Sequence, residues 1–190
     1  DVAQLNTALV RSYGDLAAGL RDAPFATYRG AVYGIPYAFQ SNLLLWRTGA
    51  TAQAPDSLAA VFDPTAETHG RAAIPDDPLQ LASAALYLAA TRPELAIRDP
   101  YELDGRQLAA AAGLVSRARG AIATYARDAR AVAALVRDGA SAVGLGVAPD
   151  VPSGTTGPVA AAVPSEGATG SADVWMVASR SRHPSCMYLW

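Results

Sequence analysis

The chain has 190 residues, a formal net charge of −2 and a hydrophobic fraction of 51%, so it is long enough to bury the core of one generous domain. All fifteen basic residues are arginine, and without lysine the chain can have neither a P-loop lysine nor a Schiff-base lysine. The arginines form no run or stripe, so nothing in the sequence indicates nucleic-acid binding, and the lone Cys186 excludes an internal disulfide.

The first third of the sequence changes from turn-rich to strand-like. Residues 1–32 are polar and weakly periodic, which predicts loops and short helical turns. From Tyr33 the sequence becomes strand-like around a proline, and after Asn42 an unbroken apolar run extends to Trp46, as is typical of a strand buried on both faces. A short helix is predicted over residues 57–62, after the turn residues 55–57.

The stretch from Ile74 to Leu88 is the point around which we expect the chain to be organised. Residues 71–74 read as a buried strand, Asp76 and Asp77 form a turn, and Pro78 stands where a first helical residue belongs. Asp77 and Gln80 fit a capping box. Open α/β sheets bind ligands where a strand ends and a helix begins. The alternative is that Asp77 is a helix cap and nothing more.

Helices and strands alternate over the rest of the central region. A second capping box at residues 99–102 predicts a helix to about residue 119. The alternation predicts a layered α/β domain with a parallel sheet over about residues 34–147. Residues 148–157 are rich in Pro, Gly, Ser and Thr and read as a linker or loop. The remaining elements are expected to be strands at 121–125, 141–147, 159–163 and 173–177, and helices at 78–90, 127–137 and from His183.

Several stretches, in this order, resemble one family of proteins. They are VYGIPYAFQSNLLLWRT (32–48), DSLAAVFDP (56–64), RAAIPDDPLQ (71–80), GASAVGLG (139–146) and VPSEGATGSADVWMV (163–177), followed by His183-Pro184. The sequence is similar to the extracellular solute-binding proteins of ABC importers, specifically the spermidine/putrescine-binding branch of the type II periplasmic-binding fold.

The resemblance implies an α/β fold of two lobes, joined by crossing strands, that close on a ligand. Residues 34–147 would form the second lobe, residues 1–33 and 158–190 incomplete portions of the first, and residues 148–157 a linker. It also implies a non-enzymatic protein without a cofactor or a metal, which captures a small solute, a polyamine or another amine, and presents it to a membrane permease. The full-length protein would be periplasmic or on the cell surface, with a lipid anchor. The 190 residues read as an excised piece, which we expect to bind solute weakly or not at all.

The resemblance also assigns the ligand-binding residues. Asp77 and Asp173 fall on carboxylates that face amino groups of the ligand, which suits a cationic amine. Ser171 falls where the family often has Trp, and Gln80 where a second acid commonly follows Asp77. These departures put spermidine or putrescine itself in question. The expected ligand-binding residues are Asp77, Asp173, Gln80, Tyr37, Phe39, Gln40, Ser41 and Ser171.

The residues alone leave alternatives open. A small α/β hydrolase or transferase could use an Asp together with His69, and a lobe reused as an interaction module could pair with a second copy of the chain. Asp173 lies in an apolar strand, so it has either an internal partner or a place in a cleft. Glu166 and Thr169 either line that cleft or belong to a solvated loop, and Trp46 and Trp175 are expected to pack.

Overall fold

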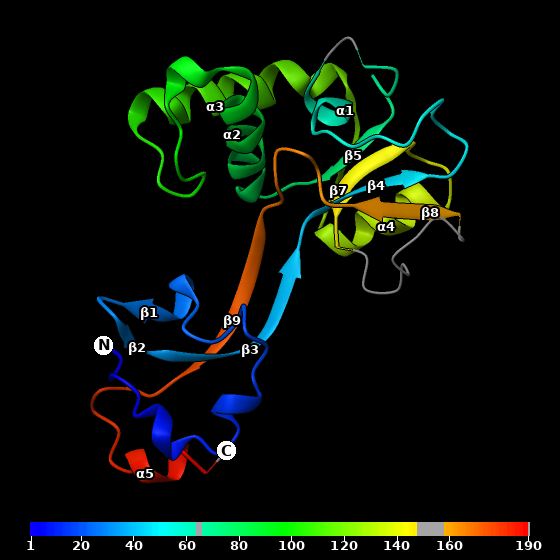
Figure 1. Cartoon of the computed structure of the whole chain (residues 1–190). Helices are drawn as coiled ribbons and strands as arrows, with labels where there is room; N and C mark the ends of the chain where they lie inside the picture. The colour runs from blue at the N-terminus through cyan, green and yellow to red at the C-terminus, as the bar shows by residue number, and fades with distance from the viewer. Residues whose placement is uncertain (64–65, 148–157, 190) are drawn as a thin grey trace. The chain divides into compact units, whose positions relative to one another are not determined.

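The computed structural model describes residues 1–63, 66–147 and 158–189. The chain forms two compact units, a first unit of Asp1–Gln40 and Gly170–Trp190 and a second unit of Ser41–Thr169 (Figure 1). The expected boundaries differ from these, because residues 34–40 belong to the first unit and residues 158–169 to the second. The expected linker, residues 148–157, lies outside the described residues.

The second unit is built on a five-stranded sheet in the order β6-β5-β7-β4-β8. Strand β5 pairs in parallel with β6 and β7, whereas β4 pairs antiparallel with β7 and β8. The prediction of a parallel sheet over about residues 34–147 is therefore wrong for β4. Parallel strands need a long crossover connection, usually a helix, and β6 and β7 each follow a full-length helix. The strands are β4 (Leu43–Arg47), β5 (Ala72–Pro75), β6 (Ile122–Ala126), β7 (Val143–Gly146) and β8 (Val159–Ala162).

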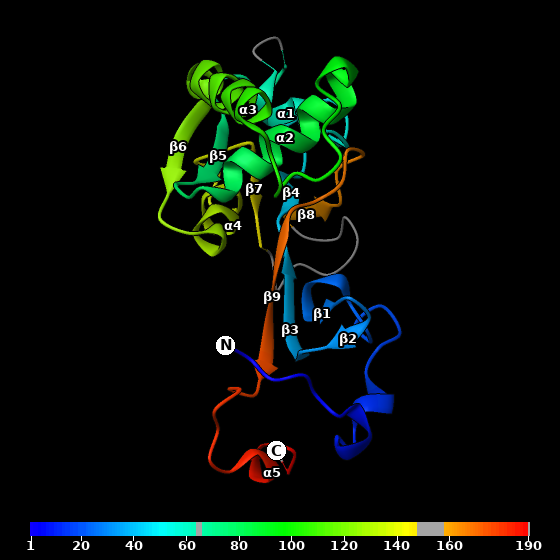
Figure 2. The same cartoon turned by 90° about the vertical axis from the view of Figure 1, so that its left-hand side faces the viewer.

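Helices cover both faces of this sheet, with α2 and α3 on one face and α4 on the other (Figure 2). Adjacent strand residues point to opposite faces, so Leu44 packs in the cluster with α1, α2 and α3 while Leu45 packs with α4. None of the described helices is long and apolar enough to cross a membrane. The helical segments are α1 (Ala59–Phe62), α2 (Leu79–Thr91), η4 (Pro93–Leu95), α3 (Gly105–Arg117), η5 (Ala118–Gly120) and α4 (Ala129–Arg137).

Helix α3 begins later than the sequence predicted. Its N-cap is Asp104, whose Oδ1 accepts from the Gln107 backbone N–H at 2.8 Å, while the Gln107 Oε1 accepts from the Asp104 N–H at 2.9 Å. Asp99 instead accepts from the Tyr101 N–H at 2.8 Å in the preceding turn. The predicted capping box at residues 99–102 is therefore wrong, because both ends of a box form only at residues 104–107.

Close packing of α4 on β7 depends on a glycine. A Cβ on Gly144 would lie 2.3 Å from the Val132 Cγ1 and 2.7 Å from the Ala73 carbonyl oxygen. Neither neighbour can retreat, since Val132 and Ala73 are both fully buried. A side chain at residue 144 would therefore push the helix away from the sheet.

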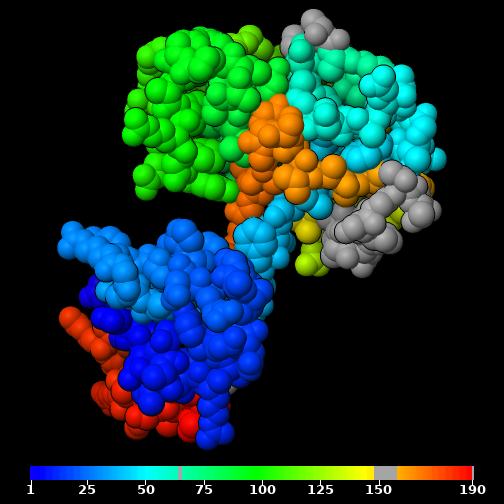
Figure 3. Space-filling view, in the orientation of Figure 1, coloured from blue at the N-terminus to red at the C-terminus, as the bar shows by residue number. Residues whose placement is uncertain are grey.

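The first unit has short elements held together by its chain ends. Figure 3 shows the N-terminal residues, in dark blue, against the C-terminal residues, in red. The Ala3 N–H donates to the Val177 carbonyl at 2.8 Å, and the Asn6 N–H donates to the Tyr188 hydroxyl at 3.1 Å. The elements are η1 (Thr7–Leu9), η2 (Tyr13–Asp15), η3 (Pro24–Ala26), the antiparallel pair β1 (Thr27–Tyr28) and β2 (Ala31–Val32), the paired strands β3 (Gly34–Ser41) and β9 (Gly170–Met176), and α5 (Pro184–Met187).

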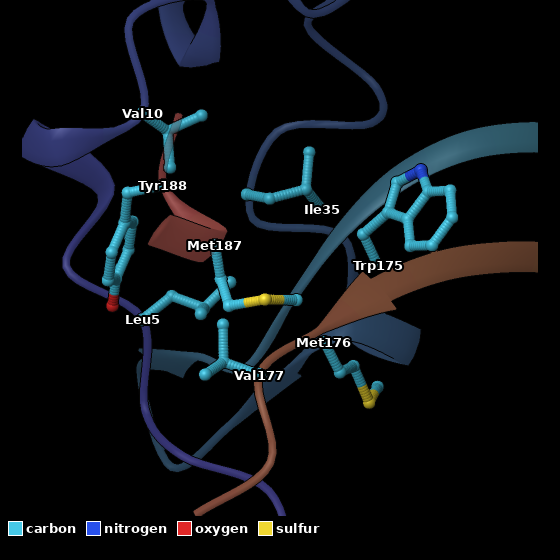
Figure 4. Close-up of a pocket in the computed structure, with 8 residues that line it drawn as sticks. All are labelled: Leu5, Val10, Ile35, Trp175, Met176, Val177, Met187 and Tyr188. Atoms are coloured by element: carbon cyan, nitrogen blue, oxygen red, sulfur yellow. The ribbon is translucent and has the colours of Figure 1, made fainter. Parts of the chain in front are cut away.

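An apolar cavity of about 250 Å³ lies inside the first unit (Figure 4). Its walls come from the N-terminal segment, β3, the end of β9 and the segment of α5. The largest fully buried side chains all belong to the second unit, so the first unit has the less completely filled core. The lining residues are Leu5, Val10, Ile35, Trp175, Met176, Val177, Met187 and Tyr188.

Candidate functional site

One face of the β3–β9 pair carries three exposed aromatic rings and a carboxylate. Alternation along each strand places Tyr37 and Phe39 on one face of β3, and Asp173 and Trp175 on one face of β9. The Tyr37 and Trp175 ring centroids lie 5.1 Å apart with the planes inclined at 32°, so the two strands present these residues on a shared face. Tyr37, Phe39 and Trp175 are 60%, 57% and 53% exposed, and Asp173 is exposed as well.

Trp175 lies on this face but is not among the ligand-binding residues expected from the sequence. The expectation that both tryptophans pack is confirmed for Trp46, which is 7% exposed, and wrong for Trp175. The apolar run around residue 175 suggested a buried strand, but β9 has only β3 as its partner in the sheet. A two-stranded ribbon leaves a face open, and the spacing of two residues between Asp173 and Trp175 is the signal that could have identified it.

Gln40 and Ser171 bind each other. The Gln40 Nε2 donates to the Ser171 Oγ at 3.1 Å, which links the end of β3 to the start of β9. The strands also approach closely there, since a Cβ on Gly170 would lie 2.7 Å from the Gln40 carbonyl oxygen. Ser41 is half-buried at the end of β3. In the described structure Gln40 and Ser171 therefore brace the ribbon beside the aromatic face.

In the second unit, Asp77 and Gln80 lie at the start of α2. The predicted capping box is wrong: the Asp77 Oδ1 accepts from the Leu79 N–H at 2.8 Å, and α2 has no side-chain cap at Pro78. Pro78 supplies no N–H, and the turn of Asp77 satisfies the next amide instead. Asp77 remains exposed, so its carboxylate is both a turn residue and an accessible negative charge.

Gln80 is a buried amide without a hydrogen-bond partner. It is 3% exposed, and among the described residues nothing bonds its Nε2 or Oε1. Buried side-chain amides in folded proteins are normally hydrogen-bonded. The described residues around Gln80 therefore provide no hydrogen bond for either atom of its buried amide.

Three further buried polar residues, Asn42, Ser83 and Thr169, form a hydrogen-bonded network that includes helix α2. The Asn42 Nδ2 donates to the Thr169 Oγ1 at 3.2 Å, and the Ser83 Oγ lies 3.1 Å from the same oxygen. The Asn42 N–H also donates to the Thr169 carbonyl at 2.8 Å. The network ties the segments that enter β4 and leave for β9 to helix α2. Ser83, a single polar residue inside the apolar run of residues 81–90, is the signal that could have predicted it.

Glu166 has a structural role at the start of α1. Its Oε2 accepts from the Leu58 N–H at 3.0 Å, and its Oε1 accepts from the Ser57 hydroxyl. Burial raises the pKa of the nearby Tyr87 hydroxyl, and the negative charges of Asp63 and Glu166 raise it further. The bonds from Ser57 and Leu58 satisfy both oxygens of the Glu166 carboxylate, so no ligand is needed to explain its position.

The structure gives no support to a catalytic or metal-dependent site at His69. The His69 side chain is exposed. Within the described ranges no three His, Cys, Asp or Glu side chains are grouped so that they could hold a metal ion. Nothing described at His69 therefore favours the hydrolase or transferase alternative, which requires an acid, a base and a nucleophile in one pocket.

Comparison with known proteins identifies the family. Residues 3–186 match the family described as bacterial extracellular solute-binding protein. The chain belongs to this family. The family consists of solute-binding proteins and not of enzymes, in agreement with the prediction from sequence.

Solved structures confirm the predicted type II periplasmic-binding fold. The spermidine/putrescine ABC transporter substrate-binding protein PotD from Streptococcus pneumoniae matches with a TM-score of 0.71 at 12% identity, over 98% of this chain and 55% of that one. The TpPotD lipoprotein of Treponema pallidum matches with a TM-score of 0.71 at 16% identity, over 99% and 57%. MotA from A. tumefaciens B6, in complex with glucopine, matches with a TM-score of 0.63 at 16% identity, over 98% and 54%. The chain thus spans about half the length of these structures.

Proposed function

We propose that the chain is the solute-binding component of an ABC importer and that its solute is a small cationic amine. The observation that carries the proposal is the β3–β9 face, where the Asp173 carboxylate is exposed on the same face as the tilted ring pair of Tyr37 and Trp175. A carboxylate binds an ammonium by charge-assisted hydrogen bonds, and aromatic faces attract the same cation and cover its methylenes. Phe39 adds a third exposed ring to this face.

We propose that the second unit also carries a carboxylate that can bind an amine. Asp77 is exposed and has one oxygen engaged by the Leu79 N–H, which leaves its Oδ2 for a ligand. In this proposal the solute also receives hydrogen bonds from four polar side chains, those of Gln40, Ser41, Gln80 and Ser171. Gln40 and Ser171 would exchange their mutual bond for bonds to the solute.

The partners and the location follow from the family. A solute-binding protein of this family works outside the cytoplasm, so we propose a periplasmic or cell-surface location and delivery of the solute to a membrane permease. One structural relative, that from Treponema pallidum, is described as a lipoprotein. A lipid anchor on the full-length protein is proposed on this likeness.

The sequence leaves weak binding and no binding open for these 190 residues, and the exposed β3–β9 face commits the proposal to weak binding. The test measures amine binding to the 190-residue chain by residue-resolved NMR, which detects weak binding. Propan-1-amine is titrated into the wild-type chain and into Asp173→Asn, with Asp138→Asn as the control for loss of an exposed carboxylate. An exposed ion pair contributes about 0.2–1 kcal/mol, so Asp173→Asn should raise the Kd by about 1.4- to fivefold. Asp138→Asn should leave the Kd unchanged.

Two outcomes would reject the proposal. One is the absence of saturable shifts on β3 and β9 with the amine. The other is equal binding of propionate, which carries the opposite charge and should be repelled by Asp173. Tyr37→Leu provides a second variant, and it should weaken binding by removing a ring that faces the cation.

A further inference from the structure

The apolar cavity of the first unit has buried walls and an exposed edge. Leu5 and Val177, which line it, are each 7% exposed, whereas Trp175 and Met187, which line it as well, are 53% and 47% exposed. In Figure 4 the side chains of Leu5, Val177 and Met187 lie together. A molecule in solution can therefore enter the cavity past Trp175 and Met187.

Backbone hydrogen bonds hold the buried walls in place. The Leu5 N–H donates to the Val32 carbonyl at 2.8 Å. The Ala3 N–H donates to the Val177 carbonyl at the same distance. The stability of a cavity depends on how far its walls can collapse, and these walls can move together only by breaking such bonds. The cavity is therefore preformed, as small-molecule sites usually are.

The walls of the cavity offer few polar groups to a ligand. None of the described residues that line it carries a charge, and the polar side-chain groups among them are the Tyr188 hydroxyl and the Trp175 indole N–H. The Tyr188 hydroxyl already accepts from the Asn6 N–H at 3.1 Å. In Figure 4 the Trp175 indole nitrogen points away from Met187. A charged group that enters such surroundings loses its hydration without compensation, so the walls favour an uncharged apolar molecule.

We infer that this cavity binds a small uncharged hydrophobic molecule, about the size of one aromatic ring with a short substituent. An engineered apolar cavity of about 150 Å³ binds benzene, so a cavity of about 250 Å³ has room for a slightly larger molecule. Burial of apolar surface drives such binding, and the sulfur atoms of Met176 and Met187 make favourable contacts with an aromatic ring. This ligand differs in class from the cationic amine, and of the residues on the amine-binding face only Trp175 also lines the cavity.

The experiment titrates toluene into the methyl-labelled 190-residue chain and follows it by NMR. Toluene should give saturable shifts of the Leu5, Val177 and Met187 methyl signals, and nuclear Overhauser effects between its protons and the Met187 methyl group. Benzoate has the same ring with a negative charge, and it should bind at least about tenfold more weakly because the walls cannot replace the hydration of a carboxylate. Absence of saturable shifts with toluene, or equal binding of benzoate, would overturn the inference.

Two phenylalanine substitutions test whether toluene binds in the cavity itself. Val10→Phe adds a ring to the cavity wall, so the Kd for toluene should rise at least about tenfold. The control Leu9→Phe adds the same ring at a neighbouring residue that is 54% exposed and does not line the cavity, and it should leave the Kd unchanged. Unchanged binding in Val10→Phe, or equal weakening by both variants, would overturn the inference. Should Val10→Phe fail to fold, the Overhauser effects to Met187 in the wild-type chain decide the question, and their absence at saturation would overturn it.

Discussion

Replacing Gln80 by leucine should stabilise the ligand-free chain. The substitution removes a buried, unpartnered amide and replaces it by an apolar side chain of similar size. An unsatisfied buried polar group costs about 1–3 kcal/mol, so the free energy of unfolding of the second unit should rise by about that amount. For a chain of this size, each kcal/mol raises Tm by roughly 2–4 °C.

The matched control is Gln107→Leu in the first turn of α3. The Gln107 amide is fully used: its Oε1 accepts from the Asp104 N–H at 2.9 Å, and its Nε2 donates to the Leu95 carbonyl at 3.0 Å. Gln107→Leu should therefore lower the free energy of unfolding, by about 1–2 kcal/mol. Both variants are measured by urea denaturation with circular dichroism, since most helical residues lie in the second unit. A loss of stability in Gln80→Leu equal to that in Gln107→Leu would refute the reasoning, because it would show that the Gln80 amide is satisfied.

Three further substitutions test the packing and the caps of the second unit. Thr169→Val should lower the free energy of unfolding by about 1–3 kcal/mol, because two buried partners lose their bonds to its hydroxyl. The control Ser141→Ala removes a buried hydroxyl that has no partner among the described residues, so it should not destabilise the fold. Equal losses of unfolding free energy for the two variants, measured by urea denaturation, would contradict the network. Gly144→Ala should lower the free energy of unfolding by about 1–3 kcal/mol through its clash with Val132. Gly113→Ala inside α3 should raise the free energy of unfolding by up to about 1 kcal/mol. Similar Tm shifts for the two variants would contradict the close contact at residue 144. A backbone N–H in the first turn of α4, and then Arg127, lower the pKa of Asp128. The Asp128 carboxylate therefore stabilises the fold above its unfolded pKa of about 3.9, and this contribution is lost as pH falls through the lowered value. The stability advantage of wild type over Asp128→Asn should shrink below about pH 4, and a difference independent of pH would contradict this.

The sequence predicted the elements of the second unit well because their patterns are local. The strand before Asp76 and the helix after Pro78 are signalled by an apolar run and by proline at the turn, and both were observed within about one residue. Strand direction was not predictable in the same way, since β4 and β8 have the composition of buried strands whichever way they run. The true cap of α3 at Asp104 competes with an equally good local pattern at Asp99, and only the folded chain decides between them.

The candidate site was predicted in part, for physical reasons that differ between its halves. Tyr37, Phe39 and Asp173 were singled out from sequence, and the structure leaves all three exposed on one strand pair. Trp175 was assigned to packing because an apolar strand is usually covered, and that depends on how many strands flank it. The unpartnered state of Gln80 is a property of its three-dimensional neighbours, so no sequence pattern could reveal it.

Mapping the amine on the wild-type chain tests the central claim most directly. In a titration of the 15N-labelled 190-residue chain with propan-1-amine, we expect saturable shifts at the backbone of Asp173 and the indole N–H of Trp175. Shifts confined to other residues, or none at the highest concentration at which the chain remains folded, would contradict it.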